Sequence, residues 1–331
     1  MLNPARTNKT YRKTKALALV LSAMMLIAPL TACSNDNAPS STVSVETSGT
    51  HSSSQNNKPS QSATNQVKSL KDIHPTLTVE KWSGEQYYVI DEESLLQIIN
   101  LAMDNVQEFY TEIGAPNMTY DKNLKIVEGK DNFFPEWLNE YFYMARAMSE
   151  SSRRIDLVTT ISGNTPDNYA HGIMQICPTS TKSTLEQYYS SIFNEDVDLS
   201  HLEVVPTKSE LANANSSKEA MESVVEKVYN NIFLSMCFDV YNVKNLNPIN
   251  HKNYYANYGG YKEDVRRLAT IGLYGTSRAT VINGLVDGNL EEKLNSIPHM
   301  KTYLSNLEKY EAYYAQKFAN SSKQYNDGME K

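Results

Sequence analysis

The chain has 331 residues, and its 31 Lys and Arg against 38 Asp and Glu give a formal net charge of −7. Nucleic-acid backbones are bound through basic surfaces, so this acidic balance argues against nucleic acid as a partner. The six His residues show no HExxH or similar spacing, and we therefore expect neither a metal ion nor another cofactor.

An export signal is predicted at residues 1–32. Basic residues precede an almost wholly apolar run from Ala16 to Leu30, which has the length of a signal-peptide core and is short for a membrane-spanning helix. The following Leu30-Thr31-Ala32-Cys33 resembles the lipobox of bacterial lipoproteins. The resemblance implies cleavage before Cys33 and acylation of its thiol, which would anchor the protein outside the cytoplasm. A Gram-positive membrane is favoured, with the outer membrane as the site in a Gram-negative cell. The alternative is an ordinary secretory signal with an incidental Cys33.

Residues 33–70 are predicted to be a linker behind the lipidated Cys. The stretch from 34 to 66 is low-complexity Ser, Thr, Asn and Gln without an aromatic residue, Leu or Ile. Such a composition cannot bury enough apolar surface to offset its chain entropy, so we expect a disordered tether. The signal contains five of the Lys and Arg and none of the Asp and Glu, so its removal brings the net charge to −12.

The chain from 71 to 320 is predicted to be mainly α-helical. We divide it into an N-terminal helical extension of unknown role at 71–130 and a second domain at 131–320, followed by a disordered tail at 321–331. Asp91 or Ser94 is the expected cap of the first helix, and a small sheet is expected at 76–90 or 122–128. Apolar residues recur at helical spacing in six segments: 94–111, 135–150, 218–243, 262–273, 277–286 and 299–318.

A series of motifs follows between residues 130 and 318. The helix at 135–150 ends in Glu150-Ser151, and Gly172-Ile173-Met174-Gln175-Ile176-Cys177-Pro178 follows after a loop. The later motifs are Asn231-Ile232, Leu268 to Tyr274, and Ile297-Pro298 through Tyr313-Tyr314. Together they resemble the soluble lytic transglycosylase family, whose fold is that of goose-type lysozyme. The resemblance implies a lysozyme-like helical domain that acts, as a monomer, on the glycan strands of peptidoglycan.

Glu150 is the candidate catalytic residue. Cleavage of a glycosidic bond requires a proton donor for the leaving oxygen, and a carboxylic acid serves when burial raises its pKa toward neutrality. Glu150 follows an apolar helix stripe and lies near the negative end of the helix dipole, and both features disfavour its ionised form. Arg153 and Arg154 would oppose this effect if they pointed inward, and we expect them to face solvent.

The motifs supply one carboxylate, whereas most glycosidases use two. Asp156 and Asp167 lie between the first two motifs, and we expect them in a polar loop. The resemblance implies that the N-acetyl group of muramic acid replaces the second carboxylate at the MurNAc-β-1,4-GlcNAc bond. Glu150, having given up its proton, would then remove one from the C6 hydroxyl, and the sugar would close into a 1,6-anhydro ring without water.

The remaining motif residues are implied to bind substrate or position the acid. Ser151 would orient Glu150, Met174 and Gln175 would line the sugar cleft, and Gly172 would give the backbone room to approach the glycan. The hydroxyl of Tyr274 is implied to lie near the acid.

Three features depart from the family pattern. The loop between Glu150 and Gly172 is longer than the usual spacing. Gly275-Thr276-Ser277 stands where the family has Asn-Ala-Gly, and Lys301 and Tyr303 stand where it has an acidic residue and an Arg. We expect these changes to affect substrate contacts rather than the acid itself, and they leave room for a weakened or inactive member.

Two other functions stay open at the level of sequence. One is a muramidase on the same fold, with water as the nucleophile, and the other is a wall-binding lipoprotein without activity. A solute-binding lipoprotein of a transport system also fits the anchor and tether, but the helical pattern and the motifs argue against it. Because the mature chain is acidic, binding to an anionic wall has to come from polar contacts and aromatic surfaces. Cys177 and Cys237 either pair or stay as buried thiols.

Overall fold

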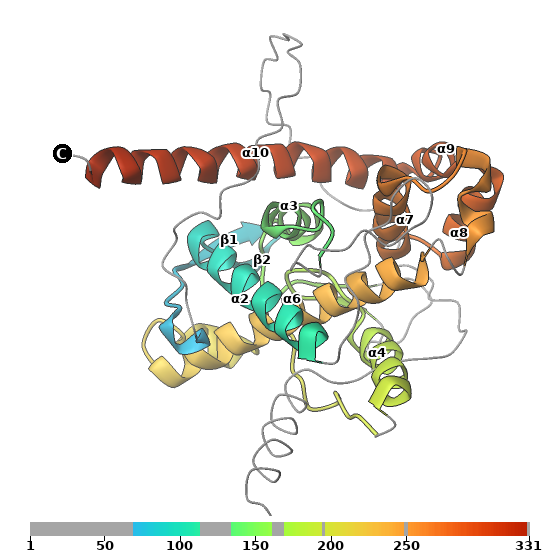
Figure 1. The fold of residues 1–331 in the computed structure, drawn as a ribbon. Helices are drawn as coiled ribbons and strands as arrows, with labels where there is room; N and C mark the ends of the chain where they lie inside the picture. Colours follow the sequence, from blue (N-terminus) through green and yellow to red (C-terminus); the bar gives the residue numbers. More distant parts are fainter. Residues whose placement is uncertain (1–68, 113–133, 161–168, 194–195, 248–250, 330–331) are drawn as a thin grey trace, which may run out of the picture.

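The computed structural model describes residues 69–112, 134–160, 169–193, 196–247 and 251–329. Within these ranges the chain is mainly helical, which confirms the predicted fold class (Figure 1). The predicted signal, Cys33, Asp167 and the segment 122–128 lie outside the described residues. Among the residues described, no helix is both long and apolar enough to cross a membrane.

A β-hairpin lies near the start of the described part, where the sequence predicted a small sheet at 76–90. Strands β1 (Leu77–Trp82) and β2 (Glu85–Ile90) pair antiparallel after the short 3-10 helix η1 (Leu70–Asp72). The turn between the strands contains Gly84, whose φ of +87° lies in the left-handed region that favours glycine. The hairpin leads directly into helix α2 (Glu92–Glu112).

Asp91 connects the hairpin to α2. One carboxylate oxygen accepts the amide of Ser94 at 2.8 Å, which is the capping interaction expected for this residue, and the other accepts the amide of Thr76 at 2.6 Å. The backbone amide of Asp91 donates to the Thr76 carbonyl at 3.1 Å. A single residue therefore fixes both the start of α2 and the approach to the hairpin.

Helix α3 (Glu140–Ser151) begins later than the predicted start at Pro135. Asn139 is its N-cap, and the side-chain oxygen accepts two amides of the first turn at 3.0 and 3.1 Å. The helix starts here because this oxygen satisfies amides that have no partner within the helix. The other end agrees with the sequence, since the helix ends in Glu150-Ser151.

Helix α6 (Lys218–Asn245) is the central element of the core, and Figure 1 shows it crossing the whole molecule. It contacts α2, α4 (Pro178–Phe193), α5 (Lys208–Asn213) and α7 (Glu263–Gly275). Most of its side chains after Met221 are buried. A helix buried on all sides must find partners for its polar groups inside the protein. The polar groups concerned include Asn231, Ser235 and Asp239.

The C-terminal helices form a group that returns to α3. Helices α7, α8 (Arg278–Asp287) and α9 (Leu290–Asn295) pack against one another, and α10 (Pro298–Met329) runs along α3 (Figure 1). The structure continues α10 through the residues predicted as a disordered tail. Extension of a helix that is already formed adds a hydrogen bond for each residue fixed, and no proline interrupts this segment.

Several elements were not predicted: the polar helix α4, and the short elements α5, α9, the 3-10 helices η3 (Lys252–Tyr254) and η4 (Ala256–Tyr258), and the strands β3 (Val158–Thr159) and β4 (Ala170–His171). Each is brief or polar, so hydrophobic periodicity gives a weak signal. The hairpin and α2 share one hydrophobic core with the later helices. The described part of the predicted extension at 71–130 is therefore packed into the same core as the rest.

Replacement of Asp91 tests this junction. Asp91→Ala removes the acceptor of two backbone amides, and we expect it to lower the free energy of unfolding by about 1–2 kcal/mol. Asp91→Asn keeps one acceptor oxygen and should lose less than half as much. Urea denaturation of the three proteins measures the difference, and equal losses in both variants would contradict the role of the carboxylate as a shared cap.

Candidate active site

Glu150 lies in the last turn of α3, where its side chain is partly buried. Burial raises the pKa of its carboxyl from 4.5 to about 7. Two neighbours oppose this rise, the guanidinium of Arg146 and the hydroxyl of Tyr303. At neutral pH the carboxyl is therefore protonated in a large fraction of molecules, which is the state that a general acid requires.

A buried ion pair lies one helical turn before Glu150. The guanidinium of Arg146 donates to both carboxylate oxygens of Asp239 on α6, at 2.6 and 3.1 Å, and to the hydroxyl of Ser235 at 3.2 Å. The side chains of Arg146 and Asp239 are both 0% exposed. Neither residue was predicted as part of the site. For Asp239 the available signal was a charged residue on the apolar stripe of its predicted helix, whereas Arg146 lies opposite the stripe of Trp137, Tyr141, Met144 and Met148 and gave no such signal.

Tyr274, the penultimate residue of α7, packs against this ion pair. The guanidinium carbon of Arg146 lies 3.8 Å from the centre of the Tyr274 ring, within the range of a cation–π contact. The Tyr274 hydroxyl donates to the backbone carbonyl of Met174, and the hydroxyl of Ser235 is 3.5 Å away. Burial raises the pKa of the Tyr274 phenol, and the charge of Glu150 adds to this rise. The structure thus places Tyr274 within electrostatic range of Glu150, with its hydroxyl bonded to the turn that contains the second motif.

Asn231 of α6 holds the turn that contains the second motif. Its side-chain amide donates to the carbonyl of His171 at 2.9 Å, and its oxygen accepts the amide of Met174 at 2.8 Å. Gly172 lies between them with a φ of +72°, and a Cβ there would come within 2.5 Å of the Asn231 Nδ2. Gly172 therefore makes room for Asn231.

Ser151 connects the end of α3 to the same turn. Its hydroxyl is 2.8 Å from the carbonyl of Ile173 and 3.0 Å from that of Ala147. No hydrogen bond of Ser151 to the Glu150 carboxyl is found among the described contacts. Ser151 therefore acts on Glu150 through the backbone, by fixing where the helix ends.

Met174 and Gln175 differ from the expectation that they line a cleft. The Met174 side chain is fully buried in the core. Gln175 is also buried, has a φ of 51°, and donates its side-chain amide to the carbonyls of Gly172 at 2.7 Å and Leu157 at 3.1 Å. In this structure both side chains stabilise the turn, because its strained backbone needs local hydrogen bonds and packing.

The departures at Gly275 and Tyr303 both involve the first turns of α10. A Cβ at Gly275 would lie 2.5 Å from the sulfur of Met300, so the start of α10 occupies the space that a side chain would need. One turn along α10, the Tyr303 hydroxyl is buried and makes no hydrogen bond of normal geometry, yet it lies close enough to Glu150 to lower the pKa of the carboxyl. Tyr303 therefore affects the acid itself, contrary to our expectation. Lys301 is exposed on α10.

The residues that follow α3 bind the hairpin. Arg153 donates to the carbonyl of Ile90 at 2.8 Å, and the guanidinium of Arg154 lies 5.2 Å from the ring centre of Trp82. The expectation that both arginines face solvent is therefore wrong, because the hairpin supplies partners for them. Asp156 accepts the amide of Tyr88 at 2.9 Å, in keeping with a role in a polar loop.

Cys237 is a free thiol, so the suggested pair with Cys177 does not form. Cys237 lies on the buried length of α6, and burial raises the pKa of its thiol. Within the described ranges, no group of three or more His, Cys, Asp and Glu is placed to hold a metal ion.

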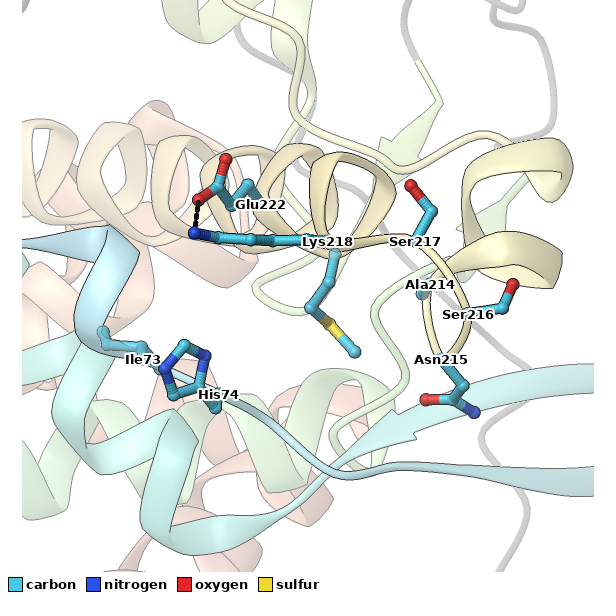
Figure 2. Close-up of a pocket in the computed structure, with 9 residues that line it drawn as sticks. Ile73, His74, Ala214, Asn215, Ser216, Ser217, Lys218 and Glu222 are labelled. Atoms are coloured by element: carbon cyan, nitrogen blue, oxygen red, sulfur yellow. Dashed lines mark ion pairs between the residues drawn. The ribbon is translucent and has the colours of Figure 1, made fainter.

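A cavity of about 320 Å³ lies elsewhere, between η1 and the start of α6 (Figure 2). His74 and Met221 line it together with residues 214–218 and Glu222, and Lys218 and Glu222 form an ion pair at 3.7 Å. None of the motif residues lines this cavity. We therefore place the candidate site at Glu150 and not in this cavity.

Substitution of Gly172 tests the turn. Gly172→Ala combines a left-handed backbone with a clash against Asn231, and we expect it to lower the free energy of unfolding by about 2–4 kcal/mol. Gly84→Ala is the matched control, since Gly84 also has a positive φ but nothing lies within 4 Å of the position that a Cβ would take there. It should lose about 1 kcal/mol. Equal losses in denaturant unfolding would contradict the close approach of Asn231.

The candidate site therefore combines residues of four helices: Arg146 and Glu150 of α3, Asn231 and Asp239 of α6, Tyr274 of α7 and Tyr303 of α10. Helix α3 supplies both the candidate acid and the cation, and the other three helices add one carboxylate and two phenols. Comparison with known proteins gives no match to a family model, to a curated protein or to a solved structure.

Proposed function

We propose that this protein is a peptidoglycan lytic transglycosylase with a lysozyme-like fold, which cleaves the MurNAc-β-1,4-GlcNAc bond without water. The observation that carries the proposal is Glu150, a partly buried carboxyl at the end of α3 whose pKa is raised to about 7. The hydrogen bonds of Asn231 to the turn at His171 and Met174 support it, because they join two of the sequence motifs in space.

The proposed reaction uses Glu150 twice. The protonated carboxyl gives its proton to the leaving glycosidic oxygen while the N-acetyl group of muramic acid supports the developing positive charge at C1. The resulting carboxylate then takes the proton of the C6 hydroxyl, whose oxygen bonds to C1. The products are a free GlcNAc end and a 1,6-anhydromuramoyl end, and Glu150 is protonated again.

The surroundings of Glu150 favour this mechanism over one with two carboxylates. Asp239 is fully buried and accepts two hydrogen bonds from Arg146, so it is not available as a nucleophile or base. Asp156 is engaged with the hairpin through Tyr88. Neither of these two described carboxylates is free, and we therefore assign the second step to Glu150 and to the substrate itself.

We further propose that the protein is a lipoprotein held at the outer face of a bacterial membrane through Cys33. The tether predicted from the sequence after Cys33 would let the helical domain reach the wall above that membrane. A muramidase on the same fold is the second candidate function. Its products differ chemically, so the same digestion experiment distinguishes the two.

Digestion of purified peptidoglycan tests the function. Mass spectrometry should find 1,6-anhydro-muropeptides, and Glu150→Gln should reduce their release at least about 100-fold, because the amide cannot supply the proton. Glu140→Gln, at the other end of the same helix, is the control and should keep wild-type activity. Fragments with reducing ends would indicate a muramidase. Full activity of Glu150→Gln, or no release by the wild type, would contradict the proposal.

The raised pKa of Glu150 also predicts a dependence of stability on pH. The carboxyl ionises at a pKa of 4.5 when unfolded and about 7 when folded, so the stability contributed by its neutral form is complete below 4.5 and is lost as pH rises to about 7. The side-chain amide in Glu150→Gln does not titrate in this range. Relative to wild type it should gain about 2 kcal/mol between about pH 4 and pH 8, allowing for partial exposure of the side chain. Denaturant titrations across this range measure the gain, and a pH-independent difference would argue against a protonated Glu150.

A further inference from the structure

The neighbourhood of Glu150 contains one permanent cation and two carboxyl groups. Arg146 is fully buried and keeps its charge, because a guanidinium does not deprotonate in proteins. A buried cation is strongly destabilising without a negative partner, so one of the two carboxyl groups has to be ionised. Among the described groups that shift the pKa of Glu150, Arg146 is the only cation. Once Arg146 is paired with one carboxylate, burial favours the neutral form of the other carboxyl.

Geometry decides which carboxyl carries the charge. Asp239 receives two hydrogen bonds from Arg146, at 2.6 and 3.1 Å, and the Tyr143 hydroxyl of α3 also faces it. Glu150 interacts with Arg146 at longer range and makes no hydrogen bond to it. The other titratable groups facing Glu150 are Tyr274 of α7 and Tyr303 of α10.

We propose that Asp239 is a positioning residue: by serving as the counter-ion of Arg146, it leaves the proton on Glu150. Without Asp239, Glu150 would be the remaining carboxyl in this neighbourhood that interacts with the buried cation, and it would ionise to neutralise it. The same ion pair supports the ring of Tyr274, which lies 3.8 Å from the guanidinium. The protonation state is inferred from the charges and from the hydrogen bonds between Arg146 and Asp239, and its catalytic consequence rests on the proposed function.

The titration of Glu150 tests the proposal independently of activity. In the full-length protein with ¹³C-labelled glutamate, the side-chain carbonyl signal of Glu150 is assigned by its loss in Glu150→Gln. Wild-type Glu150 should titrate near pH 7. Asp239→Asn should lower this midpoint by about one pH unit or more, because Arg146 then attracts the ionised form of Glu150. Asp239→Glu keeps the negative charge and should restore a midpoint near that of the wild type.

Two further variants separate this role from general stabilisation. Arg146→Met/Asp239→Leu removes both charges, and apolar replacement of a buried pair is often tolerated. Its Glu150 midpoint should be at least as high as in wild type, because burial remains and the attraction of Arg146 is gone. Glu210→Gln, which neutralises a carboxylate paired with Lys227 of α6 at 2.8 Å, is the remote control and should leave the midpoint unchanged.

The outcomes are distinct. A lowered midpoint in Asp239→Asn and a raised or unchanged one in the double variant support the proposal, whereas a purely structural role would destabilise both without moving the midpoints in this pattern. An unchanged midpoint in folded Asp239→Asn would overturn it. If Asp239→Asn does not fold, a lowered midpoint in the double variant overturns the proposal and a raised or unchanged one supports it. If the wild type does not cleave glycan but the midpoints are as expected, the proposed function is refuted and the role of Asp239 is not.

Discussion

A fully buried arginine determines how the helices around the candidate site meet. Arg146 cannot release its charge, so the fold must bring an acidic group to it, and Asp239 of α6 meets this need with both carboxylate oxygens. Because Arg146 lies on α3, the interaction fixes where α3 and α6 approach each other. The ring of Tyr274 stacks on the guanidinium and adds α7 to the contact. The acid at the end of α3 is thereby placed by an interaction that begins one turn earlier in the same helix.

Sequence reasoning identified the parts of the site whose signal is local. Glu150, Gly172 and Tyr274 were found because their immediate neighbours form recognisable motifs, and the structure places them on or next to one network. Arg146 and Asp239 are separated by 93 positions. Helical periodicity places Asp239 on the apolar stripe of its helix but Arg146 opposite the predicted stripe of its own, and it does not show which residue of another helix faces either one. The side chains of Met174 and Gln175 were misjudged for a related reason, since a motif does not show which of its members point inward.

The fold was also predicted where the signal is local and missed where it depends on distant residues. The long amphipathic helices were located from their periodicity, whereas their ends depend on single side chains such as Asn139, which replaced Pro135 as the start of α3. The hairpin was expected, but its partner was not. Its strand β2 exchanges backbone hydrogen bonds with the residues after α3, Ile90 with Arg153 and Tyr88 with Ile155. A segment outside the family resemblance therefore holds the chain that leaves the candidate acid.

The burial of the Arg146–Asp239 pair determines how strongly dissolved salt can weaken it. Dissolved ions screen charges over a Debye length of about 8 Å at physiological salt, but they act mainly where water reaches. An exposed pair such as Lys218–Glu222 weakens as salt rises, whereas a pair with no exposed side-chain surface is screened much less. The charges that surround Glu150 inside the protein are thus largely insulated from the ionic strength outside, and the counter-ion of Arg146 stays the same when the salt concentration changes.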